Sequence, residues 1–170
     1  LLPDLHKTNG RVVVLSSALH KSVAIDPGFD FDNVHSEKSY SLFATYSQAK
    51  LANCMFAIEL QRRLSEAGSR ITVNVVHPGC VRTEVTRNMP FFMRWGDWLA
   101  SPMMKWLQKT GPEGAYCTVF AATAKEMAGI GGKYLFHCQL ESFSQAAQDE
   151  KKNRKLWELS SALTDLEKEE

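Results

Sequence analysis

The sequence predicts an α/β protein built on a parallel sheet. Two short apolar runs, residues 11–15 and 71–76, are rich in valine and do not alternate regularly between polar and apolar side chains. Such runs are typical of strands that are buried on both faces. Between them, residues 43–67 carry apolar side chains at helical spacing, and Gly68 ends this segment. Strand, helix and strand in this order form the βαβ unit of a parallel sheet.

The flanking segments extend the same alternation of helices and strands. Residues 1–9 have the composition of a helix end, and Pro112-Glu113-Gly114 opens a predicted helix that continues to residue 124. Two glycines introduce a third predicted strand within residues 131–136. Residues 145–170 are charged and carry a leucine stripe, which predicts a final helix. Residues 18–42 are polar and contain Pro27-Gly28, which predicts a long irregular connection.

The overall composition is that of one soluble globular domain covering residues 1–170. Apolar residues make up 44% and charged residues 23%, and 20 Lys and Arg against 19 Asp and Glu leave a formal charge of +1. This balance gives no basis for a nucleic-acid partner. No run of about 18 apolar residues is present, so the sequence predicts no membrane-spanning helix.

Two expectations concern side chains of the predicted core. Within the helix of residues 43–67, Glu59 and the nearby Gln61, Arg62 and Arg63 are expected largely on a face separate from the apolar one. The four cysteines are widely separated in sequence, and none forms a pair at metal-binding or redox spacing. We expect reduced thiols that pack as ordinary core residues and no metal site. They are Cys54, Cys80, Cys117 and Cys138.

Polar side chains that could take part in a reaction lie where the two predicted strands end. Ser16-Ser17 follows the first strand, and His77-Pro78-Gly79 closes the second, where His77 is expected to be structural. The carboxyl ends of parallel strands meet at one edge of the sheet, where reactive groups collect. Tyr46 and Lys50 are one helical turn apart on the connecting helix, so the ammonium favours the phenolate form of the tyrosine. A phenol activated in this way, with a serine hydroxyl nearby, suits the interconversion of an alcohol and a carbonyl.

These segments together resemble the short-chain dehydrogenase/reductases, and the resemblance extends over nearly the whole chain. Later segments look like the branch that contains the retinol dehydrogenases and the WW-domain oxidoreductase. The resemblance implies a partial Rossmann-like, doubly wound parallel sheet with helices on both faces, the C-terminal part of the fold. The segments that carry it are residues 11–17, 46–53 and 76–83 and, for the branch, residues 111–115 and 129–134.

The resemblance implies a role for each matching residue. Tyr46 would be the general acid and base, and Lys50 would favour its phenolate and bind the nicotinamide ribose. Ser17 would orient the substrate oxygen, because it matches the serine of the S-x-x-G pattern of the family, in which His20 stands at the usual glycine position. Ser16 is the near alternative. The cofactor would be NAD or NADP, and the choice between them stays open. The residues expected beside its nicotinamide are Pro78, Gly79, Val81 and Thr83.

The aromatic segment of residues 90–110 corresponds to the substrate lid of the family. Its side chains would suit a lipophilic alcohol, aldehyde or ketone, retinoid-like or steroid-like. Helices that merely cover the core are an equal alternative, and peripheral contact with a membrane or a partner is a third. The residues expected to bind substrate in this segment are Phe91, Phe92, Trp95 and Trp98.

The sequence leaves the oligomeric state open. It also leaves open the choice between the cytoplasm and an endoplasmic-reticulum or lipid-associated location inside the cell.

One family feature is missing from the sequence. The phosphate-binding glycine motif that follows the first strand of the family fold occurs nowhere in the 170 residues. We therefore expect the chain to be the C-terminal portion of a longer protein and to bind NAD(P) poorly by itself. The alternative is a non-enzymatic binding or regulatory protein that retains part of the reductase scaffold.

Overall fold

A single four-stranded sheet forms the centre of the computed structural model, which describes residues 2–22, 28–81 and 108–164. The strand order is β1-β2-β3-β4. The first three strands are parallel, with Val12 opposite Val73 and Val75 opposite Tyr134, and β4 returns antiparallel to β3. The strands are β1 (Arg11–Leu15), β2 (Thr72–His77), β3 (Lys133–Phe136) and β4 (Gln139–Glu141).

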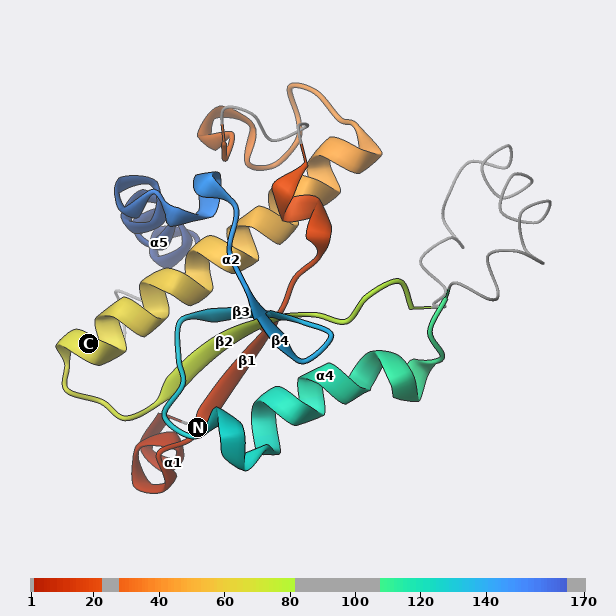
Figure 1. Cartoon of the computed structure of the whole chain (residues 1–170). Helices are drawn as coiled ribbons and strands as arrows, with labels where there is room; N and C mark the ends of the chain where they lie inside the picture. The colour runs from red at the N-terminus through yellow and green to blue at the C-terminus, as the bar shows by residue number, and fades with distance from the viewer. Residues whose placement is uncertain (1, 23–27, 82–107, 165–170) are drawn as a thin grey trace.

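Helices cover both faces of this sheet. Helices α2 (Leu42–Glu66) and α5 (Glu150–Leu163) lie on one face and α4 (Gly111–Thr123) on the other, whereas α1 (Leu2–Thr8) precedes β1 (Figure 1). Short 3-10 turns connect these elements. They are η1 (Ala18–Lys21), η3 (Phe31–Asn33), η5 (Lys125–Met127) and η6 (Gln145–Gln148).

The strands are continuous apolar runs because their side chains are buried on both faces of the sheet. Successive residues of a strand point to opposite faces, so Val75 packs under α2 while Val76 packs under α4. Tyr134 and Leu135 divide between the same two clusters. Both faces of the sheet are therefore apolar, as expected for a parallel sheet between two helical layers.

The fold class predicted from the sequence is confirmed, and most element boundaries agree within one or two residues. The final helix is the main exception. Asp149 accepts a hydrogen bond from the backbone nitrogen of Lys152 and caps α5, so the helix begins at Glu150 rather than near residue 145. The short, exposed β4 was not predicted, because its three residues Gln139–Glu141 carry little apolar pattern.

Two expectations about individual side chains are wrong. Glu59 is 1% exposed, and its carboxylate accepts hydrogen bonds from Arg62 and Arg63, so it is a buried charge that α2 itself neutralises. Cys80 is exposed, in contrast to the buried Cys54 and Cys117, because it follows the Pro78-Gly79 turn beyond the end of β2.

Candidate active site

Ser16 connects the end of β1 to helix α2. Its hydroxyl is buried and donates a 2.8 Å hydrogen bond to the backbone carbonyl of Lys50. The same oxygen accepts a hydrogen bond from the Cys54 thiol at 3.2 Å. Nearby, the Asn53 amide donates to the Leu15 carbonyl at 2.9 Å. These contacts hold one face of α2 against the carboxyl end of the first strand.

Ser17 has a different environment from its neighbour. Its side chain is half-buried and accepts a hydrogen bond of 3.3 Å from the backbone nitrogen of Leu19, at the start of η1. Since the Ser17 oxygen acts as an acceptor in this contact, its own hydroxyl proton is available for another acceptor. The Ser16 proton, by contrast, is committed to the Lys50 carbonyl.

His20 fixes the segment that carries Ser17, a role that sequence reasoning missed. Its ring is fully buried, and Nδ1 lies 2.7 Å from the Ser17 carbonyl oxygen, while Nε2 lies 3.2 Å from the backbone nitrogen of Ser144. The carbonyl needs a donor and the amide needs an acceptor, so the ring is neutral with its proton on Nδ1. Burial, the largest cause, lowers the pKa of His20. The one signal in the sequence that could have indicated this role is that His20 occupies the position where the family pattern usually has glycine.

Tyr46 and Lys50 lie together on α2, as their spacing predicts. Tyr46 is 38% exposed, and the Lys50 ammonium lies 5.4 Å from the centroid of its ring. Among the described residues, no carboxylate forms an ion pair with Lys50. Within the part of the chain that the structure describes, the phenol and the ammonium are therefore available to a ligand at the edge of the sheet where β1 ends.

The turn after β2 brings a further cation to this region. Gly79 has a φ of 90°, in the left-handed region that favours glycine. The Lys109 ammonium lies 3.4 Å from the Pro78 carbonyl oxygen, and the Lys109 backbone nitrogen donates to the Cys80 carbonyl at 2.8 Å. Val81 continues this contact as an isolated parallel bridge to Lys109. Sequence reasoning missed Lys109, since nothing in its own sequence context links it to the Pro78-Gly79 turn.

His77, at the end of β2, is packed rather than free. Its ring stacks on Phe136 with centroids 4.8 Å apart, and Nδ1 accepts from the Gly79 backbone nitrogen at 3.4 Å. Burial, ahead of several nearby cationic groups, lowers its pKa. These contacts agree with the structural role expected for His77. Most of the expected lid at residues 90–110, namely residues 90–107, lies outside the described residues. The same holds for the site residues Thr83, Phe91, Phe92, Trp95 and Trp98.

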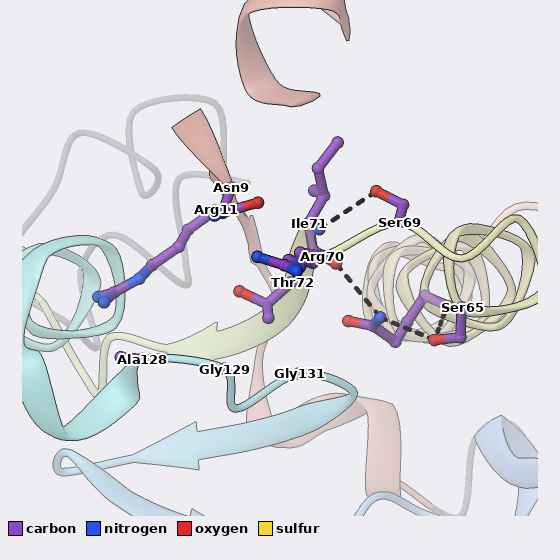
Figure 2. A pocket seen from close by; sticks show the side chains of 11 residues that line it. Asn9, Arg11, Ser65, Ser69, Arg70, Ile71, Thr72, Ala128, Gly129 and Gly131 are labelled. Atoms are coloured by element: carbon purple, nitrogen blue, oxygen red, sulfur yellow. Dashed lines mark hydrogen bonds between the residues drawn. The ribbon is translucent and has the colours of Figure 1, made fainter. Parts of the chain in front are cut away.

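A separate polar hollow lies at the opposite edge of the sheet. Its volume is about 610 Å³, and it is lined by the beginnings of β1 and β2 and by the turn that contains Gly129 and Gly131 (Figure 2). Arg11 at its rim is already held by the carbonyl oxygens of Ala122 and Ala124, at the end of α4. None of the predicted site residues lines this hollow.

The described ranges hold neither a metal-binding cluster nor a membrane-spanning helix. No group of three or more His, Cys, Asp and Glu side chains in residues 2–22, 28–81 and 108–164 is arranged to hold a metal ion. No helix in the same part of the chain is long and apolar enough to cross a bilayer.

The residues present fit one end of a nicotinamide dinucleotide. The exposed Tyr46 phenol and the Lys50 ammonium, which forms no ion pair with a described carboxylate, are the groups expected to bind the nicotinamide ribose. The Pro78-Gly79 turn ends the neighbouring strand at the same edge of the sheet. Groups for the pyrophosphate would come from a glycine-rich turn, and the sequence contains no such motif.

Comparisons with known proteins show similarity to dehydrogenases. A family model for short chain dehydrogenases matches residues 33–91. Human Retinol dehydrogenase 14 is 38% identical over 160 residues, which covers 92% of this chain and 44% of the relative. Human Polyprenol dehydrogenase is 36% identical over 171 residues, which covers 96% of this chain and 49% of the relative. The chain thus spans about half the length of the curated relatives it matches.

A solved structure shares the fold of this chain. The crystal structure of an uncharacterized protein from Mycobacterium paratuberculosis matches with a TM-score of 0.65 and 29% identity, over 91% of this chain and 50% of that chain. Fold, motif spacing and sequence similarity therefore agree over most of the chain. Residues 33–91 thus match the short-chain dehydrogenase family, and the chain is similar over 92% of its length to a retinol dehydrogenase.

Proposed function

We propose that this chain provides the proton-transfer half of an NAD(P)-dependent dehydrogenase that acts on a lipophilic alcohol or carbonyl compound. The observation that carries the proposal is the Ser16–Lys50 hydrogen bond, which joins the strand end next to Ser17 to the helix of Tyr46 and Lys50. The lipophilic class is supported by relatives whose names specify retinol and polyprenol. The aromatic residues Phe91, Phe92, Trp95 and Trp98 are proposed to contact that substrate.

Each side chain has a distinct part in the proposed reaction. The Tyr46 hydroxyl takes the proton from an alcohol substrate, or returns it to a carbonyl oxygen. The Lys50 ammonium stabilises the phenolate and binds the ribose, and the free proton of Ser17 is donated to the substrate oxygen. Pro78, Gly79, Val81 and Thr83 are proposed to bind the nicotinamide side of the cofactor. A bound nicotinamide cofactor supplies or accepts the hydride.

The experiment is a steady-state assay of the complete polypeptide that contains this sequence, with NAD and NADP and with a series of primary alcohols of increasing apolar length. We expect kcat/KM to rise with chain length. Lys50→Met should lower kcat/KM by about 100-fold or more, because it removes a charge close to the reacting phenol. The matched control is Lys38→Met, which changes an exposed lysine in the loop before α2. Equal activity of the two variants would contradict the proposal.

A further inference from the structure

Two cysteines from distant parts of the sequence lie in contact. Cys117 is buried on α4, and Cys138 follows it by 21 positions in the turn between β3 and β4. The backbone nitrogen of Cys138 donates a hydrogen bond of 3.2 Å to Cys117 Sγ, which brings the two residues side by side. Both residues pack in the apolar cluster under α4, so their neighbours hold them together.

The backbone at Cys138 is a second, independent observation. His137 and Cys138 have φ values of 51° and 60°, so both central residues of the β3–β4 hairpin turn are left-handed. Asn-Gly and similar pairs are the usual residues of such a turn, and other side chains are disfavoured there. A cysteine held in this conformation, with its backbone nitrogen bonded to the sulfur of another cysteine, points to a use for the thiol.

The other two cysteines lack a comparable arrangement. Cys54 is buried and donates its thiol proton to Ser16 Oγ, and burial raises its pKa to about 11. Cys80 is exposed and is bonded to no other cysteine of the described residues. All four cysteines of the sequence lie in the described ranges, so Cys117 and Cys138 are the one pair in contact there.

We propose that Cys117 and Cys138 form a thiol–disulfide exchange site whose oxidant is a small-molecule disulfide. The Cys138 thiolate attacks one sulfur of that disulfide, which forms a mixed disulfide and releases the first thiolate. The Cys117 thiolate then attacks the Cys138 sulfur, which forms the internal disulfide and releases the second thiolate. Two cysteine thiols are oxidised, one external disulfide is reduced to two thiols, and the two cysteine protons pass to the leaving thiolates.

The environment of Cys138 makes this a slow but selective site. Burial, followed by the contact with Cys117, raises the pKa of the Cys138 thiol, and the nearby Lys109 ammonium opposes that shift. A small fraction of thiolate at neutral pH slows the first step. Selectivity comes from the second step, because Cys117 Sγ already lies 3.2 Å from the backbone nitrogen of Cys138, the residue whose sulfur it attacks.

The internal disulfide would attach the β3–β4 turn to α4 near the proposed cofactor segment. His137, next to Cys138, accepts a hydrogen bond at Nδ1 from the Lys109 ammonium, which is 3.2 Å away. Lys109 in turn lies against the Pro78 carbonyl. Two contacts, His137 to Lys109 and Lys109 to Pro78, therefore link the cysteine pair to the Pro78-Gly79 turn. The exchange reaction itself requires no dehydrogenase activity.

The test uses the full chain with Cys80→Ser, which removes the exposed thiol. The protein is equilibrated with mixtures of reduced and oxidised glutathione, and intact mass, free-thiol titration and peptide mapping are then measured. We expect the loss of two hydrogen atoms and one linked peptide pair that contains Cys117 and Cys138, with Cys54 free. Oxidation should also raise Tm by about 5 °C or more, because it closes a loop of about 20 residues.

Two controls separate selective exchange from random oxidation. Cys138→Ser in the same background should form no internal disulfide and show no rise in Tm. The Cys80→Ser chain unfolded in urea should lose its preference for the Cys117–Cys138 pair. This control uses the same variant, so it does not depend on whether another variant folds. Three free thiols after equilibration in oxidised glutathione would overturn the proposal. A stable glutathione adduct at Cys138 without linkage to Cys117, or linkage to Cys54 instead, would also overturn it.

Discussion

The buried hydroxyl of Ser16 donates a 2.8 Å hydrogen bond to the carbonyl oxygen of Lys50, which fixes α2 against the end of β1. Ser17, the next residue, has an oxygen that accepts from Leu19 and a proton that is not committed to either neighbour. The two adjacent serines are therefore suited to different roles, Ser16 to anchoring the helix and Ser17 to contacting a substrate.

Substitution of each serine by alanine should separate these roles. Ser16→Ala leaves the buried Cys54 thiol without its acceptor, and we expect the free energy of unfolding to fall by about 1–2 kcal/mol. Ser17→Ala should change it by less than about 0.5 kcal/mol while lowering kcat about 100-fold. Urea unfolding and steady-state kinetics of both variants make the comparison. A reversed pattern, with Ser16→Ala inactive but fully stable, would assign the substrate contact to Ser16.

The buried Glu59 predicts a pH-dependent contribution to stability. Hydrogen bonding from Arg62, the largest cause, holds the pKa of this carboxyl below its ordinary value, with a further contribution from Arg63. Since the pKa is lower in the folded state, the stabilisation is fully present above the unfolded pKa, about 4.3, and is lost as the pH falls through the folded value. Glu59→Gln should therefore destabilise the chain by about 1–3 kcal/mol at pH 7, with a smaller effect below pH 4.

Glu66 supplies the matched control for Glu59. It also pairs with Arg62, but its side chain is 64% exposed. Glu66→Gln should change stability by less than about 0.5 kcal/mol, because exposed ion pairs contribute little. Urea unfolding of both variants at pH 7 and pH 3.5 tests the difference. Equal destabilisation by the two substitutions would show that burial of Glu59 is unimportant.

His20 predicts a second pH window, at higher values. Its pKa is lowered in the folded state, so the unfolded chain binds the proton more readily, and stability falls as the pH drops below about 6.5. Protonation also removes the Nε2 acceptor that the Ser144 nitrogen uses. His20→Gln should lower stability at pH 7.5 by about 1–3 kcal/mol and reduce its dependence on pH between 6.5 and 5.

The control for His20 is the exposed His35, for which His35→Gln should leave that pH dependence unchanged. Thermal unfolding followed by circular dichroism from pH 5 to pH 7.5 is the measurement. An unchanged slope in His20→Gln would mean that other groups produce the pH dependence.

The sequence predicted the fold well where the signal was local. Valine-rich strands, the long apolar helix and the four-residue spacing of Tyr46 and Lys50 each depend on residues close in sequence. Contacts between distant residues could not be read in the same way. The packing of α5 and η6 against α2 joins distant parts of the chain, and the contact of His20 with Ser144 spans 124 positions. Lys109 reaches the Pro78 carbonyl across 31 positions, and Cys117 meets Cys138 only because a hairpin turns back onto α4.

Cofactor binding by the 170-residue chain itself is expected to be weak. The sequence has no glycine-rich turn for the pyrophosphate, so only contacts at the nicotinamide end remain. Isothermal titration calorimetry with NADH and NADPH should give no binding in the low-micromolar range. Low-micromolar affinity for either cofactor would mean that other residues of this chain bind the phosphates.

The most direct test of the proposed chemistry is the turnover of Tyr46→Phe, measured in the complete polypeptide that contains this sequence. The substitution removes only the hydroxyl that transfers the proton. We expect kcat to fall by about 100-fold or more while the Kd for the cofactor stays within about twofold. Tyr40→Phe, at a tyrosine that is 69% exposed, should retain full activity. If Tyr46→Phe kept more than about a tenth of the wild-type kcat, Tyr46 would not be the proton-transfer residue.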